Sequence, residues 1–432
     1  MIIFLISKIF NQLNLSKIKF LTIFLIANSL FLTSSKAINI DDAINIAQAN
    51  NRNIKLEQIR HKNIKIEKVK AITEFLPNIS ASAEYAERNS FYEGQTYDRS
   101  TKQRTREIKV EQPIFDGLHS VSKYREADYK VKSSGSKISD KIQEISFLAV
   151  QSYCNLFRYQ ELIAISKDNK KLSSDFLKLL NRRKEVRIID NADIIKFNYE
   201  ASIVEEKYLD SVNRFNKAKY EYKNIIGEIH DNLLQPKLPA EKLINEKMLE
   251  QALLNNHNIK SYRFSYLASK ASLNAEKSNF LPKVSVSASA SKQDRVVYLN
   301  NKDLNSRSVA LNVSIPIFQK GLEYANVIKA SHDRDLAKEE YEIIRESIIK
   351  EFSAAVEEYN FVLELNKTNK KLFEMAKNRA EIFNKRSKLK TEDPIEVIRA
   401  KIEFNDRKTN YINSQMDLII AHYKIKYFLG EI

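Results

Sequence analysis

The chain has 432 residues, a formal net charge of +16 and one cysteine, Cys154. A single cysteine excludes an internal disulfide, so packing alone must hold the fold together. Lysine and arginine are interleaved with aspartate and glutamate along the whole chain. This distribution is typical of a solvated surface and argues against a nucleic-acid-binding protein.

The N-terminal segment has the pattern of an export signal. Residues 1–37 contain no acidic residue; Lys8, Lys17 and Lys19 precede the uncharged run 20–32, and the segment ends in mostly small residues up to Ala37. The pattern predicts a signal peptide over residues 1–37. An uncleaved anchor is the alternative, but a bilayer span needs about 20 apolar residues. No later segment is apolar for about 18 residues, so we expect no transmembrane helix.

The rest of the chain repeats itself at an offset of about 204 residues. The matched landmarks are Asn53-Ile54-Lys55 with Asn258-Ile259-Lys260, Phe75-Leu76-Pro77 with Phe280-Leu281-Pro282, Pro113-Ile114-Phe115 with Pro316-Ile317-Phe318, Gly117 with Gly321, and Gly227 with Gly430. Glycine and proline punctuate secondary structure, so matched punctuation indicates one backbone path used twice. We predict a first repeat over 38–233, a linker over 234–242 and a second repeat over 243–432.

Each repeat begins with a predicted helical stretch, 41–74 and 246–279, that ends at Leu-Pro because proline disfavours helix in the residue before it. A β-hairpin of about ten-residue strands follows, since the hydrophobic period changes to two. Its polar connections, 87–106 and 292–307, are expected outside the cell. The apolar positions of the second hairpin are Val284, Val286, Val309, Leu311, Val313 and Ile315, and its alternating polar positions are Ser285, Ser287 and Ser289.

A very long helix is predicted after each hairpin, over 118–184 and 322–390. Apolar and small residues recur there with heptad spacing, which is typical of helices packed side by side. The positions are Ile138, Ile142, Ile145, Ala149, Ser152, Leu156, Tyr159 and Ile163, and in the second repeat Ile348, Phe352, Ala355, Tyr359 and Val362. About 67 residues at 1.5 Å each give a helix of about 100 Å, longer than a compact domain uses.

Acidic residues mark the start of each return helix. Asp190 and Asp393 occupy predicted N-cap positions, and Asp193 and Glu396 follow three residues later, as in a capping box. The return helices end at Gly227 and Gly430. Four strands per chain are too few to close a barrel, so strands that enter a membrane require several chains.

This order of elements, present twice, resembles the TolC family of outer-membrane efflux channels. The resemblance implies a mainly α fold with a small β part: long helical hairpins form a periplasmic α-barrel, and four strands per chain contribute to a trimeric transmembrane β-barrel. It implies a homotrimer in the outer membrane that extends into the periplasm. It also implies that outer-membrane lipid, a periplasmic adaptor (membrane fusion protein) and an inner-membrane transporter are partners. The family's usual glycine at the hairpin tips is replaced here by charged residues around Arg187 and Lys390.

The function implied is a passive exit duct of a tripartite efflux pump or a type I secretion system; a soluble periplasmic coiled-coil scaffold or adaptor is the alternative. We expect Ser285, Ser287 and Ser289 to face the lumen and the alternating apolar residues to face lipid. Charged residues at the hairpin tips either only cap helices, which their spacing favours, or also pair across neighbouring hairpins and hold the aperture closed, which the resemblance implies. These charged residues are Arg187, Asp190, Asp193, Lys196, Lys390, Glu392, Asp393, Glu396 and Arg399.

No catalytic constellation is predicted. The six histidines are widely separated, without a pair spaced to bind one metal, and no glycine-rich phosphate loop is present. Cys154 falls in the heptad-bearing helix and is expected to pack there rather than to act as a nucleophile. We therefore expect no enzyme activity, no metal and no cofactor.

Overall fold

A computed structural model describes residues 37–90, 99–185, 191–230, 232–239, 246–297, 300–318, 320–389 and 391–432. The chain divides into two compact units. The first contains the described residues of Met1–Ala49, Ala149–Leu238 and Asn369–Ile419, and the second those of Asn50–Leu148, Pro239–Thr368 and Ile420–Ile432. The predicted signal peptide lies outside the described residues, apart from Ala37.

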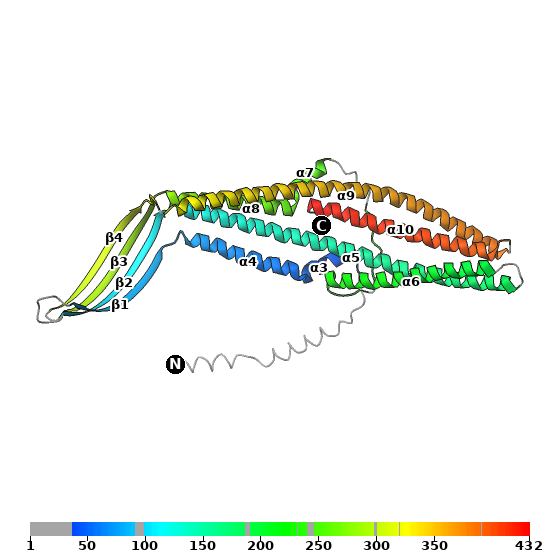
Figure 1. The fold of residues 1–432 in the computed structure, drawn as a ribbon, viewed down its shortest axis with the longest axis horizontal. Coiled ribbons are helices and arrows are strands. Elements are labelled where there is room, and N and C mark those ends of the chain that lie inside the picture. The colour runs from blue at the N-terminus through cyan, green and yellow to red at the C-terminus, as the bar shows by residue number, and fades with distance from the viewer. Residues whose placement is uncertain are drawn as a thin grey trace, which may run out of the picture. The chain divides into compact units, whose positions relative to one another are not determined.

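Matched helices recur in the two halves of the chain with almost the same lengths (Figure 1). The long helices α5 (His119–Glu185) and α9 (Leu322–Lys388) have 67 residues each, as predicted. The return helices α6 (Asn191–Ile226) and α10 (Pro394–Leu429) have 36 residues each. Both long helices therefore reach about 100 Å at 1.5 Å per residue.

The opening helical stretch of each half is interrupted, where the sequence predicted one continuous helix. The helices are α3 (Ile40–Asn50) and α4 (Arg52–Thr73), then α7 (Glu246–Asn255) and α8 (His257–Lys277), which a short 3₁₀ turn, η1 (Ser278–Phe280), follows. The cause is an asparagine at each break. The side chain of Asn51 accepts a hydrogen bond from the Asn53 N–H, and Asn256 caps α8 in the same way. An asparagine cap favours a new helix start over continuation.

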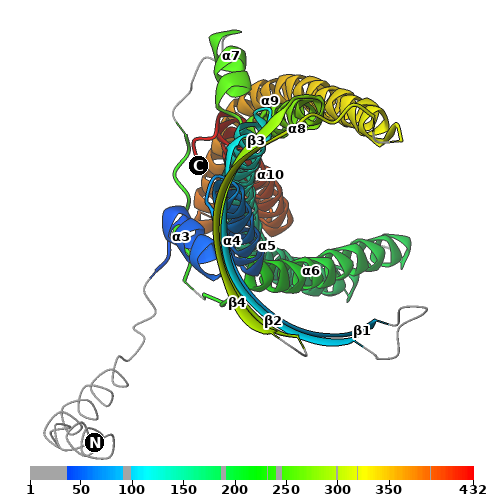
Figure 2. The same ribbon diagram turned by 90° about the vertical axis from the view of Figure 1, so that its left-hand side faces the viewer.

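The strands form one antiparallel sheet in the order β1-β2-β3-β4, and Figure 2 shows it as a continuous curved ribbon. The strands are β1 (Asn78–Ser90), β2 (Arg99–Phe115), β3 (Lys283–Val297) and β4 (Asn300–Ser314). They have 13 to 17 residues, so the prediction of ten-residue strands was wrong. Much of the predicted polar connections is paired strand. Cross-strand ion pairs such as Lys102–Glu87 (3.6 Å) accompany this pairing.

Each unit has its own interior. In the first unit, the partly buried Arg158 on α5 pairs with Asp417 on α10 at 2.5 Å, and the Asn405 amide of α10 donates to Asp168 on α5 at 2.8 Å. In the second, Lys68 on α4 pairs with Asp128 on α5 at 2.7 Å. The predicted heptad positions are confirmed in part: Ile145, Ala149, Ser152, Leu156, Ile348, Phe352, Ala355, Tyr359 and Val362 are buried. Ile138, Ile142, Tyr159 and Ile163, toward the two ends of the first seam, are only partly buried.

Candidate functional sites: a two-faced sheet and a charged helix end

The register of the sheet gathers the apolar residues of all four strands on one face. Ile79 lies opposite Val110, which pairs with Ala288, and Ala288 pairs with Val309. Because side chains alternate between faces, every second residue from these positions shares their face. We call this the apolar face; it consists of Ile79, Ala81, Ala83, Ile108, Val110, Val284, Val286, Ala288, Ala290, Val309, Leu311 and Val313.

The apolar face is solvent-exposed in the single chain. Val309 is 79 % exposed and Leu311 67 % exposed. Ile315, which follows the last residue of β4, is 59 % exposed. An apolar surface of this kind on a sheet marks a membrane or a partner rather than water.

The opposite face is rich in hydroxyl groups. Ser285, Ser287 and Ser289 lie on it together, as alternation requires. The Ser289 hydroxyl lies 2.9 Å from that of Ser308 on β4, and the Asn312 amide donates to the Ser287 hydroxyl at 3.1 Å. This polar face can contact water through side chains of both hairpins.

At the start of α10, Asp393 combines two contacts. Its Oδ1 accepts a hydrogen bond from the Ile395 N–H at 2.9 Å, so the predicted helix cap is present. The Arg183 guanidinium on α5 donates to the same oxygen at 2.7 Å. Burial opposes ionisation, but the bonds from Arg183 and the Ile395 N–H prevail and lower the pKa of Asp393 below its ordinary value. A cap and an ion pair between two helical hairpins thus share one carboxylate.

The other predicted residues at this end are arranged differently. Glu396 pairs with Arg399 in its own helix at 2.8 Å, so it does not complete a capping box with Asp393. Glu392 lies 3.6 Å from Arg386, and Lys196 is exposed on α6. Arg187, Asp190 and Lys390 lie outside the described residues, as does the side chain of Asp193.

The sequence analysis did not identify Arg183 as a site residue. It is one of three basic residues in the last turn of α5, where a cation suits the helix dipole. Its contact with Asp393 spans 210 residues of sequence. No local pattern predicts such a pair; the two hairpins must first be placed side by side.

A hydrophobic cluster lies at the same end of the helices as these charged residues. Leu180 on α5, Ile194 on α6 and Ile395 on α10 are buried together, with Phe176 and Phe197 packed against them. Beside this cluster, α5, α6 and α10 enclose a groove of about 530 Å³ whose lining includes both phenylalanines and a mixed set of charges. The charged lining residues are Glu200, Arg399, Glu403, Asp406 and Arg407.

The structure gives little support to chemistry at Cys154. Its side chain is fully buried, and burial raises the pKa of the thiol to about 12. A thiol of this kind is protonated at neutral pH and inert as a nucleophile. Within the described ranges, histidine, cysteine and acidic residues form no group of three or more that could hold a metal ion. Among the described helices, none is long and apolar enough to cross a membrane.

Comparison with known proteins identifies relatives of this chain. Residues 248–431 match the family model described as outer membrane efflux protein. Over 93 % of its length the chain is 20 % identical to the outer membrane protein TolC of Salmonella enteritidis, of which it covers 84 %. It is also 20 % identical to the outer membrane efflux protein BepC of Brucella suis over 57 % of its length, and this match spans about half of BepC (55 %).

Solved structures give the fold. The crystal structure of the Campylobacter jejuni CmeC outer membrane channel matches with a TM-score of 0.75 at 14 % identity, covering 91 % of this chain and 85 % of that one. At this identity the match establishes a shared fold. It confirms the predicted combination of long helical hairpins with a small sheet.

Proposed function

We propose that this chain, which belongs to the family of TolC-like outer membrane efflux proteins, forms the passive exit duct of a tripartite efflux pump or a type I secretion system. Relatives described as outer membrane and efflux proteins support the duct over a soluble periplasmic adaptor. The single observation that carries the proposal is the exposed apolar face of the sheet, exemplified by Leu311. A soluble adaptor has no use for such a face.

The sheet also supports a homotrimer. Its outer strands, β1 and β4, each have one edge without a neighbour in the described sheet. In lipid these backbone groups need partners, so the sheets of several chains would join edge to edge. Two chains give eight strands, whose side chains fill the interior; three chains give twelve, which can enclose water. The hydroxyl-rich face suits a watery lumen, so we favour three chains, with the apolar face toward lipid.

The long helix α9 offers a second surface for a neighbouring chain. Three large apolar residues on it and a fourth directly after its last residue are exposed at multiples of seven residues: Phe361, Met375, Ile382 and then Leu389. This stripe differs from the buried seam of the same helix and is typical of side-by-side helix packing. We infer that a helix of the adjacent chain covers this stripe. The helical wall would then be built from both repeats of each chain, 38–233 and 243–432.

The far helix ends would meet the other components of the pump. We propose that the groove beside Phe176 and Phe197 accepts a helical hairpin of a periplasmic adaptor, because it combines aromatic anchors with charges of both signs. The adaptor would connect the duct to an inner-membrane transporter, which supplies the energy. Transport through the duct itself would be passive.

Fractionation and electrophoresis test the proposal. The protein should sediment with outer membranes and migrate as a trimer without heating and as a monomer after boiling. Recovery in the soluble periplasmic fraction would overturn it. Affinity purification after crosslinking tests the partners separately: an adaptor and a transporter should co-purify with the wild type and be lost from Phe197→Glu, whereas Tyr220→Glu, an exposed aromatic on α6 outside this groove, serves as the control.

A further inference from the structure

Three basic side chains lie where the apolar face ends, toward the connections within the two hairpins. Arg106 on β2 is directly opposite Lys292 on β3. Arg307 on β4 is directly opposite Ala290 on β3, which makes it a diagonal neighbour of Lys292. Directly opposite Cβ atoms are about 5 Å apart and diagonal neighbours about 7–8 Å. One phosphate group can therefore be reached by all three residues, which we call the basic cluster.

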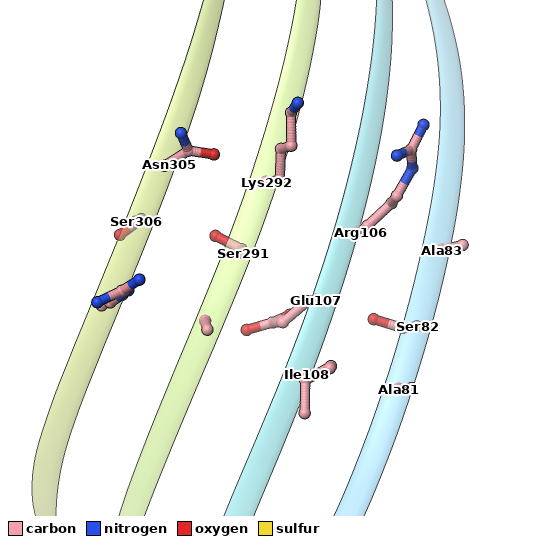
Figure 3. A pocket seen from close by; sticks show the side chains of 12 residues that line it. Ala81, Ser82, Ala83, Arg106, Glu107, Ile108, Ser291, Lys292, Asn305 and Ser306 are labelled. Carbon is pink, nitrogen blue, oxygen red and sulfur yellow. The ribbon is translucent and has the colours of Figure 1, made fainter.

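The basic cluster lines a shallow groove of about 550 Å³ that crosses all four strands (Figure 3). Its walls are two adjacent rows of the register. One row is Ala81, Ile108, Ala290 and Arg307, and the other is Ala83, Arg106, Lys292 and Asn305. Both rows lie on the apolar face. The row between them points its side chains to the other face, so it lines the groove with backbone.

Acidic neighbours neutralise the basic cluster only in part. Asp294 lies 3.7 Å from Arg106 and 3.8 Å from Lys292, and Asp303 lies 3.6 Å from Lys292. These separations exceed the roughly 2.7–2.9 Å of charge-assisted hydrogen bonds, so the donors keep the capacity to bind a closer anion. The side chains of Arg106 and Lys292 are 63 % and 49 % exposed. The arrangement presents donors outward, beside an apolar surface.

We propose that this groove binds the phosphate of a phosphorylated glycolipid of the lipid A type in the outer leaflet of the outer membrane. A phosphomonoester carries close to two negative charges and three acceptor oxygens, which suits two guanidinium groups and an ammonium group. The acyl chains would cover the adjoining apolar rows around Ile108 and Val309. Charge and apolar surface together fit an anionic amphiphile better than free phosphate.

This inference rests on the proposed function, which places the apolar face in the membrane, and on the expectation that the connections within the hairpins lie outside the cell. Of the two leaflets, the outward one then borders the basic cluster. Glycolipid phosphates of that leaflet lie at the boundary between acyl chains and water, which is the position that Arg106, Lys292 and Arg307 occupy at the end of the apolar rows.

Full-length protein in phosphatidylcholine nanodiscs allows the test. Lipid A and its fully dephosphorylated form would be titrated, and binding measured by native mass spectrometry. We expect lipid A to bind at least tenfold more tightly than the dephosphorylated form. The variant Arg106→Gln/Lys292→Gln/Arg307→Gln should lose this preference while keeping the wild-type oligomer and helical circular dichroism.

A matched pair of single variants locates the effect. Lys292→Gln should weaken lipid A binding severalfold, whereas Lys109→Gln, on β2 but on the polar face, should leave it unchanged. Equal binding of both lipids by the wild type, or an unaltered preference in the triple variant, would overturn the inference and leave the duct proposal intact. Failure of the wild type to enter nanodiscs would contradict both.

Discussion

At the scale of single residues, Asp140 on α5 lowers the free energy of unfolding by an amount that depends on pH. Burial, and next the nearby Glu144 carboxylate, raise the pKa of Asp140 to about 6, although Lys141 and a hydrogen bond with Tyr427 oppose them. Unfolded aspartate titrates near pH 4. Between about pH 4 and 6 the folded state therefore binds more protons, and stability falls as the pH rises through this window.

Asp140→Asn removes this destabilisation, because asparagine does not ionise. At pH 7 the variant should be more stable than the wild type by roughly 1–3 kcal/mol, and the difference should disappear below about pH 4. Thermal denaturation at a series of pH values measures it. Asp175→Asn on the same helix is the control, since the Asp175 side chain is 46 % exposed and pairs with Lys178 in its own turn. A difference that does not change with pH would contradict the argument.

Two glycines that the sequence presents as equivalent should respond differently to alanine. Gly117 and Gly321 both have positive φ, +71° and +80°, where a Cβ costs about 1–2 kcal/mol. At Gly117 the added Cβ would also lie 2.6 Å from the Ser278 carbonyl oxygen and 2.7 Å from the Leu281 Cβ, whereas at Gly321 no atom of the described residues lies within 4 Å. Gly117→Ala should therefore lower the melting temperature clearly more than Gly321→Ala. Equal losses would mean that backbone strain alone matters.

At the scale of elements, the facing of the strands is the first test. In the proposed orientation Leu311 points to lipid, and an arginine there should cost about 2–4 kcal/mol if the residue lies near the bilayer midplane. Leu311→Arg should assemble poorly, as measured by the yield of heat-sensitive trimer. Ser287→Arg places the same side chain on the polar face of the neighbouring strand and should assemble normally. The reverse pattern would exchange lumen and lipid.

The elements also show which parts of the fold can be predicted from the sequence. Helix lengths and the buried heptad seam follow from period and punctuation, since residues such as Ala149 and Phe352 repeat in phase. Strand ends do not follow, because polar residues such as Lys102 and Lys292 remain paired when ions on neighbouring strands offset their charge. The helix breaks at Asn51 and Asn256 were readable in principle as N-caps. The basic cluster required the register of three strands.

At the scale of the whole molecule, the contact between Arg183 and Asp393 has a role only if the ends of several hairpins meet in one ring. In the proposed duct, such links would hold neighbouring hairpins together and keep the aperture narrow until an adaptor separates them. The same carboxylate caps α10, and the loss of a cap alone costs about 0.5–2 kcal/mol. A useful variant must therefore break the ion pair and spare the cap.

Arg183→Gln meets this condition, because the Asp393 carboxylate still accepts from the Ile395 N–H. If the pair restrains the aperture, single-channel conductance in planar bilayers should rise severalfold in Arg183→Gln, with little change in melting temperature. Arg158→Gln is the control, since its ion pair with Asp417 also joins α5 to α10 but lies 25 residues from Arg183 along α5. It should lower stability and leave conductance unchanged. Wild-type conductance in Arg183→Gln would limit Asp393 to capping its helix, because a restraint on the aperture cannot be lost without widening the narrowest part of the conducting path.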